Sequence, residues 1–177
     1  MKTDPQKIRA LLTENEPIII ESVCVTASTN EDMKKTAREG AEEIRLLIAD
    51  RQTAGKGSKG RSFFSPDGTG CYMSFLLRPG IKPEECILLT TIAAVATAEA
   101  IEKLTGKQAD IKWVNDIYMG GKKVAGILTE GAFKNKDKID FAVVGIGINL
   151  AVPEGGFPEE IKNIAGSADA AGKKNEL

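Results

Sequence analysis

The stretch Ala54-Gly55-Lys56-Gly57-Ser58-Lys59-Gly60-Arg61-Ser62 places three glycines and three cations within seven residues. Glycine lets the backbone approach a ligand closely, and exposed amides beside lysine and arginine form a concave site for an anion. The stretch therefore predicts a loop that holds a carboxylate or a phosphate group. A flexible basic surface loop is the alternative interpretation.

The residues around this loop decide the fold class. Gly55, Gly57 and Gly60 fit the pattern G-x-G-x-x-G, but a Rossmann fingerprint must open a helix. The following residues 62–68 cannot start a long helix, and residues 71–77 have the pattern of a strand. P-loop spacing is absent, and the chain has no histidine for the H-R-D motif of a protein kinase. We therefore expect the loop to connect two strands.

Composition bounds the class of protein. A chain of 177 residues is long enough for one domain with a sizeable core, and a net charge of −1 does not indicate nucleic-acid binding. Cys24, Cys71 and Cys86 are widely spaced, which indicates neither a zinc site nor disulfides, and we interpret them as buried, reduced and structural. Without a signal-like or membrane-spanning stretch, a cytoplasmic protein is expected.

Local patterns predict an alternation of helices and strands. Helices are predicted over 4–12, from Thr29 to about 39, and 83–104, and strands over 18–23, 44–49, 71–77, 111–113, 122–128 and 139–150. Thr29 and Asp32 have the spacing of a capping box. Gly120-Gly121 predicts a two-residue hairpin turn. The long third helix is apolar on most of its circumference and is expected to back the sheet.

Several polar residues stand where strands end. Capping a helix needs only one of Ser28, Thr29 and Asn30, so two small polar groups remain at a junction of the kind that often faces ligands. Gln52 offers a donor and an acceptor to a polar ligand, although a solvated loop glutamine is an equal alternative.

The second half of the chain carries charged candidates and two glycines on one strand face. Lys123 enters an apolar strand and should need an anionic partner, unless it is an edge-strand lysine that prevents aggregation. Asp116 could hold Mg²⁺ beside the phosphates of a nucleotide, and Asn149 could bond an adenine, ribose or phosphate. Gly145 and Gly147 predict that another group packs closely against their face.

Five motifs, in order along roughly residues 26–150, resemble those of biotin protein ligases. They are Ser28-Thr29-Asn30, Gln52-Thr53-Ala54-Gly55-Lys56-Gly57-Ser58-Lys59-Gly60-Arg61, Lys112-Trp113-Val114-Asn115-Asp116, Lys123-Val124-Ala125-Gly126-Ile127-Leu128-Thr129-Glu130 and Gly145-Ile146-Gly147-Ile148-Asn149. The resemblance implies an α/β (α+β) fold in which helices flank a mixed, largely antiparallel β-sheet, as in the class II synthetase-like catalytic domains of biotin and lipoate ligases. We expect this domain to cover residues 1–177, without a winged-helix DNA-binding domain and with the small C-terminal β domain absent or truncated.

The resemblance also implies a two-step reaction. Biotin and ATP with Mg²⁺ give biotinyl-5′-AMP and pyrophosphate, and a lysine of a biotin carboxyl carrier domain then takes the biotinyl group. The expected protein is a monomer or homodimer with no nucleic-acid or membrane partner. Two alternatives remain open: a lipoate or other acyl-adenylate ligase on the same fold, and a biotin- or nucleotide-binding module with little turnover.

Roles for single residues follow by motif. The resemblance implies catalytic roles for Lys123 and Arg61, and Asp116 as the metal ligand. For biotin it implies Ser28, Thr29, Asn30, Gln52, Gly55, Lys56, Gly57, Ser58 and Lys123. For ATP it implies Lys56, Arg61, Lys112, Trp113, Asn115 and Asn149.

The chain departs from the family pattern at three positions. The family usually has arginine at the two positions held here by Lys56 and Ser58, and lysine lacks the bidentate phosphate geometry of arginine. Ser58 removes a cation, which predicts weaker retention of the adenylate. Val114 replaces the usual proline.

Overall fold

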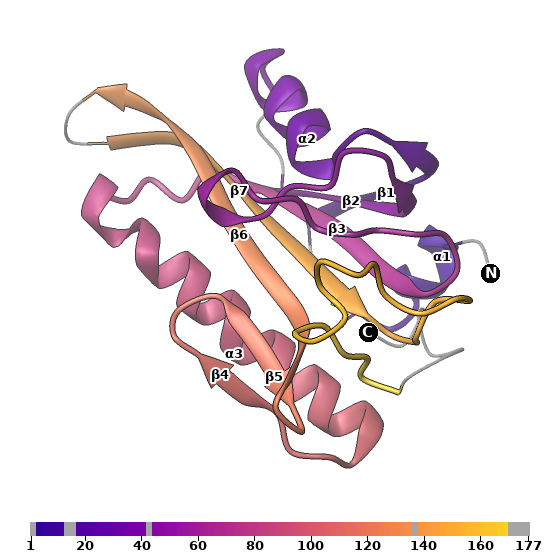
Figure 1. Ribbon diagram of the computed structural model, residues 1–177. Coiled ribbons are helices and arrows are strands. Elements are labelled where there is room, and N and C mark those ends of the chain that lie inside the picture. Colours follow the sequence, from indigo (N-terminus) through magenta and orange to yellow (C-terminus); the bar gives the residue numbers. More distant parts are fainter. Residues whose placement is uncertain (1–2, 13–16, 42–43, 136–137, 170–177) are drawn as a thin grey trace.

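The computed structural model describes residues 3–12, 17–41, 44–135 and 138–169 (Figure 1). The predicted domain end at residue 177 lies outside the described residues. In chain order the elements are α1 (Pro5–Arg9), β1 (Ile18–Thr26), α2 (Thr29–Arg38), β2 (Ile44–Gln52), the 3₁₀ turn η1 (Ser58–Gly60), β3 (Gly70–Leu77), the 3₁₀ turn η2 (Pro83–Glu85), α3 (Cys86–Thr105), β4 (Asp110–Lys112), β5 (Asp116–Met119), β6 (Lys122–Asn135) and β7 (Lys138–Asn149).

The strands form one seven-stranded sheet in the order β1-β2-β3-β7-β6-β5-β4. Only the β1–β2 pair is parallel, and every other neighbouring pair is antiparallel. The predicted mixed, largely antiparallel sheet is therefore confirmed, and the glycine-rich loop joins β2 to β3 as expected. Gly120 and Gly121, at φ of 54° and 76°, make the tight turn before β6, a backbone region that favours glycine.

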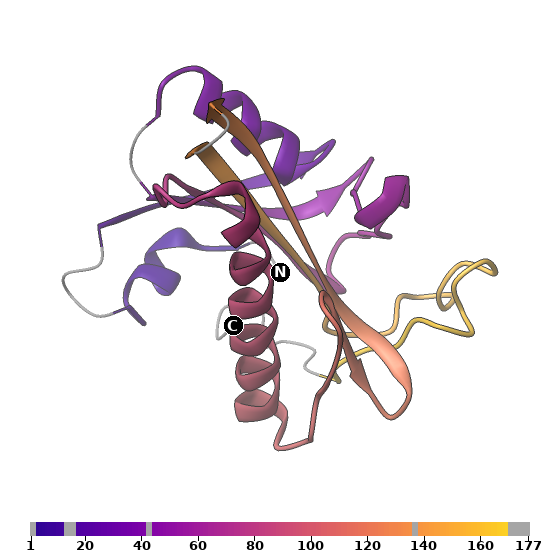
Figure 2. The same cartoon turned by 90° about the vertical axis from the view of Figure 1, so that its left-hand side faces the viewer.

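Alternating side chains of β7 separate the core into two layers. Val144, Ile146 and Ile148 belong to the cluster that includes Ala94, Ala98 and Ile101 of α3. Phe141 and Val143 belong to the cluster that includes Met33 and Ala37 of α2. Because successive residues of a strand point to opposite faces, α2 and α3 cover opposite faces of the sheet (Figure 2). Gly145 and Gly147 continue the α2 face, where they leave room beyond the apolar layer.

The start of α2 differs from the prediction. Ser28 is the N-cap residue but makes no side-chain cap hydrogen bond. Instead, the Thr29 amide donates to Gln52 Oε1 at 2.9 Å, and the Asp32 carboxylate accepts from Thr26 Oγ1. The predicted capping box is therefore wrong, because an acceptor on β2, distant in sequence, satisfies the first-turn amide.

One further expectation is confirmed and one needs correction. Helix α3 backs the sheet as expected and buries Ala94, Thr97, Ala98 and Ile101 against it, while the apolar side chains on its other side are exposed, namely Ile87, Leu88, Ile92 and Val95. Of the three cysteines, Cys71 is buried and Cys86 half-buried, whereas Cys24 is exposed on β1. Cys24 is on β1, which is the edge strand of the sheet that the described residues form.

Arg78 fastens the C-terminal end of α2 to the sheet. Its guanidinium donates to the carbonyls of Ala37 and Ala41 at 2.7 and 2.8 Å, and to the Asp140 carboxylate at 3.0 Å. We expect Arg78→Leu to lower the free energy of unfolding by about 2 kcal/mol, because hydrogen bonds from a charged group are lost. Urea denaturation measures the change. The exposed Arg38 of α2 is the control, and an equal loss in Arg38→Leu would contradict the role of Arg78.

Candidate functional site

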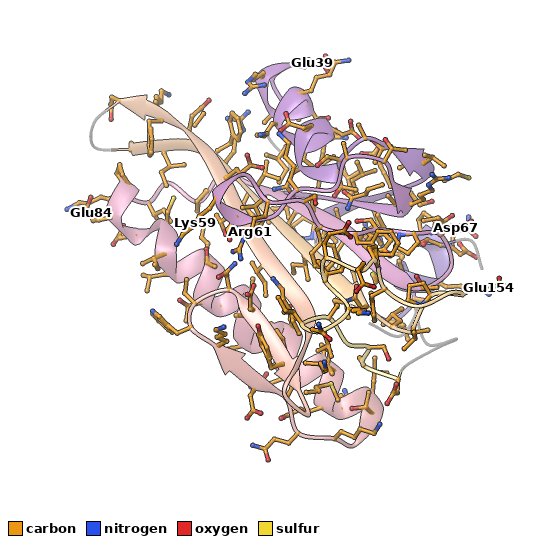
Figure 3. The ribbon with its side chains drawn as sticks, in the orientation of Figure 1. Glu39, Lys59, Arg61, Asp67, Glu84 and Glu154 are labelled. Atoms are coloured by element: carbon orange, nitrogen blue, oxygen red, sulfur yellow. The ribbon has the colours of Figure 1, made fainter. Side chains whose placement is uncertain are left out.

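A first cavity lies on the α2 face of the sheet, with about 430 Å³ of empty space that includes the solvent at its mouth. Figure 3 shows the side chains of the protein, with Lys59 and Arg61 of the glycine-rich loop labelled. The first cavity is bounded by the start of α2, the loop, and strands β6 and β7. Its polar lining residues are Ser28, Thr29, Asn30, Gln52, Lys56, Ser58, Asn115, Asp116 and Lys123.

Gly145 and Gly147 allow this cavity to exist beside its polar wall. A Cβ atom at Gly145 would lie 2.1 Å from Asn30 Oδ1, and one at Gly147 would lie 2.6 Å from the ring of Phe63. The Phe63 ring in turn meets Tyr72 edge-on, with centroids 6.4 Å apart. The predicted close packing against this strand face is confirmed, since any side chain at either glycine would displace Asn30 or Phe63.

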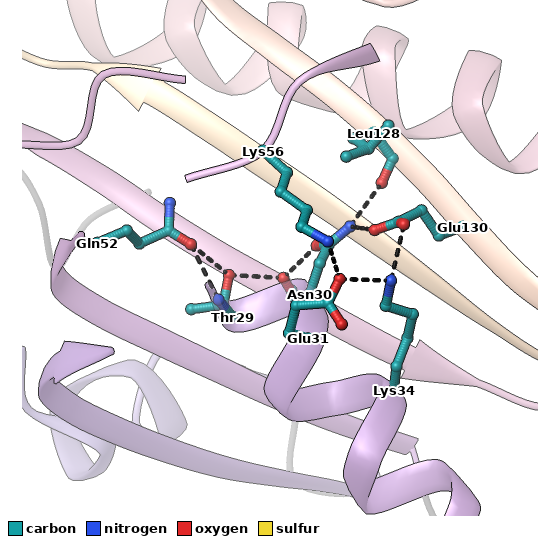
Figure 4. A network of polar contacts seen from close by, with 9 residues as sticks. Thr29, Asn30, Glu31, Lys34, Gln52, Lys56, Leu128 and Glu130 are labelled. Carbon is teal, nitrogen blue, oxygen red and sulfur yellow. Dashed lines mark hydrogen bonds and ion pairs between the residues drawn. The ribbon is translucent and has the colours of Figure 1, made fainter. Parts of the chain in front are cut away.

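A continuous chain of hydrogen bonds fixes the polar wall (Figure 4). Gln52 Oε1 accepts from the amide and the hydroxyl of Thr29, at 2.9 and 3.1 Å. The buried Ser74 hydroxyl lies 2.7 Å from Thr29 Oγ1 and 2.6 Å from Asn30 Oδ1. Asn30 Nδ2 donates to Glu130 Oε2 at 2.9 Å. These contacts hold the wall in one geometry.

An ion pair joins Asp116 and Lys123, with 2.6 Å between Oδ1 and Nζ and side chains only 14% and 24% exposed. The predicted anionic partner of Lys123 is therefore confirmed. The edge-strand alternative is wrong, because Lys123 pairs with Tyr118 of β5 on one side, and on the other side its amide and carbonyl bond to Ile164 and Gly166. Both residues line the first cavity and also a second one, so the pair marks the junction of two cavities.

The second cavity is larger, with about 1430 Å³ of empty space that includes the solvent at its mouth, and it opens beside the loop. Arg61, Lys112 and Asn149 line it, and the segment 157–165 forms its other wall. Lys112 Nζ lies 5.3 Å from the centroid of the Tyr118 ring, and Asn149 Nδ2 donates to the carbonyl of Gly166 at 3.0 Å. Positive side chains therefore face a roomy cavity that adjoins a narrower polar one.

The structure distributes the predicted site residues between the two cavities. Of the residues expected for biotin, all except Gly55 line the first cavity. Gly55 is buried at the start of the loop, where a Cβ would lie 2.4 Å from the Phe63 carbonyl oxygen. Of those expected for ATP, Arg61, Lys112 and Asn149 line the second cavity, whereas Lys56 and Asn115 line the first. Trp113 is 74% exposed and lines neither cavity.

Sequence reasoning missed two parts of the site. Phe63 lies between the cavities, and segment 157–165 contributes Phe157, Ile161 and Ile164 to the second one. These three apolar residues recur within an otherwise polar, glycine- and proline-containing stretch, and that recurrence is the available signal for a segment that covers a ligand.

Two carboxyl groups beside the first cavity are held in their anionic form. Hydrogen bonds from Lys34 and then Lys56 lower the pKa of Glu31 to about 2. Burial alone would raise the pKa of Glu130, but hydrogen bonds from Lys34 and Asn30 outweigh it, so its pKa lies below the ordinary value. Both carboxylates are therefore charged at neutral pH.

A pH dependence of stability follows from the lowered pKa of Glu31. A carboxyl group whose pKa is lower in the folded state stabilises the fold above its unfolded pKa, and this contribution is lost as pH falls toward the folded value. We expect the wild type to have a higher urea midpoint than Glu31→Gln. This difference should be largest above about pH 5 and should shrink between pH 4.5 and pH 2. A difference that grows on acidification would contradict this assignment.

The described residues contain neither a cluster of metal-ligating side chains nor a membrane-spanning helix. Within residues 3–12, 17–41, 44–135 and 138–169, no group of three or more metal-ligating side chains gathers at one place. None of the helices in these ranges has the length and apolar character needed to cross a bilayer.

The fold places a narrow polar cavity next to a larger one that positive side chains line. A model of the biotin/lipoate A/B protein ligase family matches residues 22–149, and the chain belongs to this family. The bifunctional ligase/repressor BirA of Bacillus subtilis is 44% identical over 151 residues, which cover 85% of this chain and 46% of that protein. The biotin–[acetyl-CoA-carboxylase] ligase of Paracoccus denitrificans is 36% identical over 137 residues, covering 76% and 56%.

A solved structure agrees with these relatives. The biotin protein ligase of Aquifex aeolicus in complex with biotin and ATP superposes with a TM-score of 0.66 and 35% identity, over 88% of this chain and 62% of that one. The chain spans about half the length of the curated relatives it matches.

Proposed function

We propose that this chain is the catalytic domain of a biotin protein ligase, which converts biotin and ATP to biotinyl-5′-AMP and pyrophosphate and then biotinylates a carrier-domain lysine. The observation that carries the proposal is the position of Lys123, at the junction of a small polar cavity and a larger basic one. Adenylation requires a carboxylate and an α-phosphate to meet, and a cation at their meeting point offsets their repulsion.

In this proposal the first cavity holds biotin and the second holds the nucleotide. Thr29, Asn30 and Gln52 present amide and hydroxyl groups to the ureido ring, in positions already fixed by their mutual hydrogen bonds. The biotin carboxylate oxygen attacks the α-phosphorus, the bond to the β-phosphate oxygen breaks, and pyrophosphate leaves. Lys123 and Arg61 stabilise the negative charge that develops on the phosphoryl oxygens.

The second step transfers the biotinyl group to a biotin carboxyl carrier domain. The neutral ε-amine of a carrier lysine attacks the acyl carbon of the adenylate, the bond to the phosphate oxygen breaks, and AMP leaves. The amine loses its proton, and the products are an amide and AMP. This step needs no covalent nucleophile from the protein, and the described cavities need only hold the adenylate in place while the amine arrives.

Mg²⁺ would accompany ATP in this proposal. Asp116 is the residue that would hold it, because its carboxylate is mostly buried and lies at the cavity junction, where Lys123 is its partner. Mg²⁺ is usually bound by one or two carboxylates together with substrate phosphates, so one aspartate suffices. The ion would offset the charge of the polyphosphate chain. The present partner of Asp116, Lys123, would then be free to contact the biotin carboxylate.

Ser58 is expected to make the adenylate escape faster than in an arginine-bearing relative. Its hydroxyl accepts from Arg61 Nη2 at 2.8 Å, while Lys59 is exposed in a left-handed conformation with φ of 58°. A neutral hydrogen bond is worth about 1 kcal/mol and a charge-assisted one about 2–3, so Ser58→Arg should slow dissociation of biotinyl-AMP roughly tenfold and reduce labelling of bystander proteins. An unchanged off-rate would show that Arg61 or Lys59 already supplies the charge.

Pyrophosphate release tests the function. We expect release with biotin and MgATP, and much less with lipoate. Release with lipoate alone would favour a lipoate ligase on the same fold. Tight biotin binding by calorimetry without any pyrophosphate would identify a binding module with little turnover, and would refute the proposed activity.

A further inference from the structure

The glycine-rich loop reaches across to helix α2 through one lysine. The Lys56 ammonium, which lines the first cavity, contacts the Glu31 carboxylate on the first turn of α2 (Figure 4). Glu31 itself does not line that cavity. One partner is on the loop and the other on the helix, so their contact joins two elements that bound the first cavity.

Glu31 belongs to a group of two carboxylates, Glu31 and Glu130, and two ammonium groups, Lys34 and Lys56, whose charges sum to zero. Lys34 Nζ lies 2.7 Å from Glu31 Oε1 and 2.8 Å from Glu130 Oε1. Lys34 and Glu130 form the inner pair of this group, and their side chains are only 13% and 28% exposed. The side chains of Glu31 and Lys56 are 40% and 44% exposed. Lys56 therefore supplies the second positive charge for two carboxylates, and Glu31 connects the fixed inner pair to the loop.

The other contacts of the loop hold its own shape or its two ends. The Gly57 amide donates to the Arg61 carbonyl at 2.7 Å, and the Phe63 amide donates to the Gly55 carbonyl at 2.8 Å. The Ala54 amide donates to the Ala27 carbonyl at 2.9 Å, which fixes the entrance to the loop. Movement of the loop tip away from α2 leaves these contacts intact, but it must break the ion pair of Lys56 with Glu31.

We propose that Glu31 is a positioning residue that fastens the loop of residues 54–62 to α2 through Lys56 and so slows the opening of the first cavity. The identity of the molecule bound in the cavity rests on the proposed function. The pair matters in this chain because Ser58 leaves the loop with one cation fewer to hold an anionic ligand. Glu31 lies outside the cavity and acts on the ligand through Lys56.

Amide hydrogen exchange of residues 54–62 in the ligand-free protein tests the contact. We expect Glu31→Gln and Lys56→Gln each to speed exchange about twofold to fivefold, the range for a partly exposed ion pair. The double variant should be no faster than either single one, Lys56→Arg should match the wild type, and the differences should vanish in about 1 M salt. Glu39→Gln is the matched control, because Glu39 pairs with Lys35 at 3.9 Å near the other end of α2. Unchanged exchange in Glu31→Gln would overturn the proposal.

Dissociation of pre-formed biotinyl-AMP tests the consequence. Glu31→Gln should raise the off-rate by the same factor as it raises loop exchange, while Glu39→Gln should leave it unchanged. Faster exchange with an unchanged off-rate would show that the loop does not control escape, and would overturn that part of the proposal. A protein that does not bind the adenylate would instead refute the proposed function, and the ligand-free exchange result would still decide the role of Glu31.

Discussion

Lys123→Ala is expected to lower the rate of biotin adenylation by a hundredfold or more at saturating biotin and ATP. Loss of one electrostatic contact to a transition state costs about 3 kcal/mol, and Lys123 is placed between the two cavities whose ligands must react. Single-turnover measurement of biotinyl-AMP formation reports the chemical step directly. A near-normal rate constant would refute the assignment of Lys123.

Removal of Lys123 also leaves the Asp116 carboxylate, 14% exposed, without its cation. The variant must therefore be shown to fold, by circular dichroism and by its biotin affinity. Lys123→Arg retains the charge and should recover stability more fully than activity, because a guanidinium does not reproduce the compact charge of an ammonium. Lys134→Ala, at the exposed outer end of β6, is the matched control and should leave the rate unchanged.

Asp116→Asn is expected to have the second largest effect, weakening the use of MgATP at least tenfold more than the binding of biotin. A carboxylate that contributes to Mg²⁺ coordination cannot be replaced by an amide without loss of metal affinity. Titration of the adenylation rate with Mg²⁺ at fixed ATP, together with calorimetry for biotin, separates the two effects. The wild type should need less Mg²⁺ than the variant.

The ion pair of Asp116 with Lys123 supplies a competing explanation for that variant. If Asp116 only orients Lys123, then Asp116→Asn should lower the affinities for biotin and ATP equally and leave the Mg²⁺ dependence unchanged. That result would remove Asp116 from the metal site.

Local sequence patterns predicted the strands and helices because each is set by near neighbours. The close packing at Gly145 and Gly147 could be predicted from one strand alone, since glycine repeated on a single face indicates a close contact. An anionic partner for Lys123 could be predicted because a lysine in an apolar strand needs one. The partner is itself local, because the Gly120-Gly121 hairpin brings β5 and β6 together.

The contacts that could not be predicted join residues distant in the chain. Asn30 and Glu130 are 100 residues apart, and they meet because α2 lies over β7 beside β6. The Gln52 contact that replaced the capping box depends on β1 and β2 being parallel neighbours. The Lys56 contact with Glu31 depends on how the loop folds over the sheet, which no local pattern of residues specifies.

Mass spectrometric detection of biotinyl-5′-AMP after incubation with biotin and MgATP tests the central claim most directly. The account predicts a biotinyl-AMP product, formed with one pyrophosphate for each adenylate and reduced a hundredfold or more in Lys123→Ala. A folded wild-type protein that binds biotin and ATP but forms no adenylate, or that forms the same amount in Lys123→Ala, would contradict it.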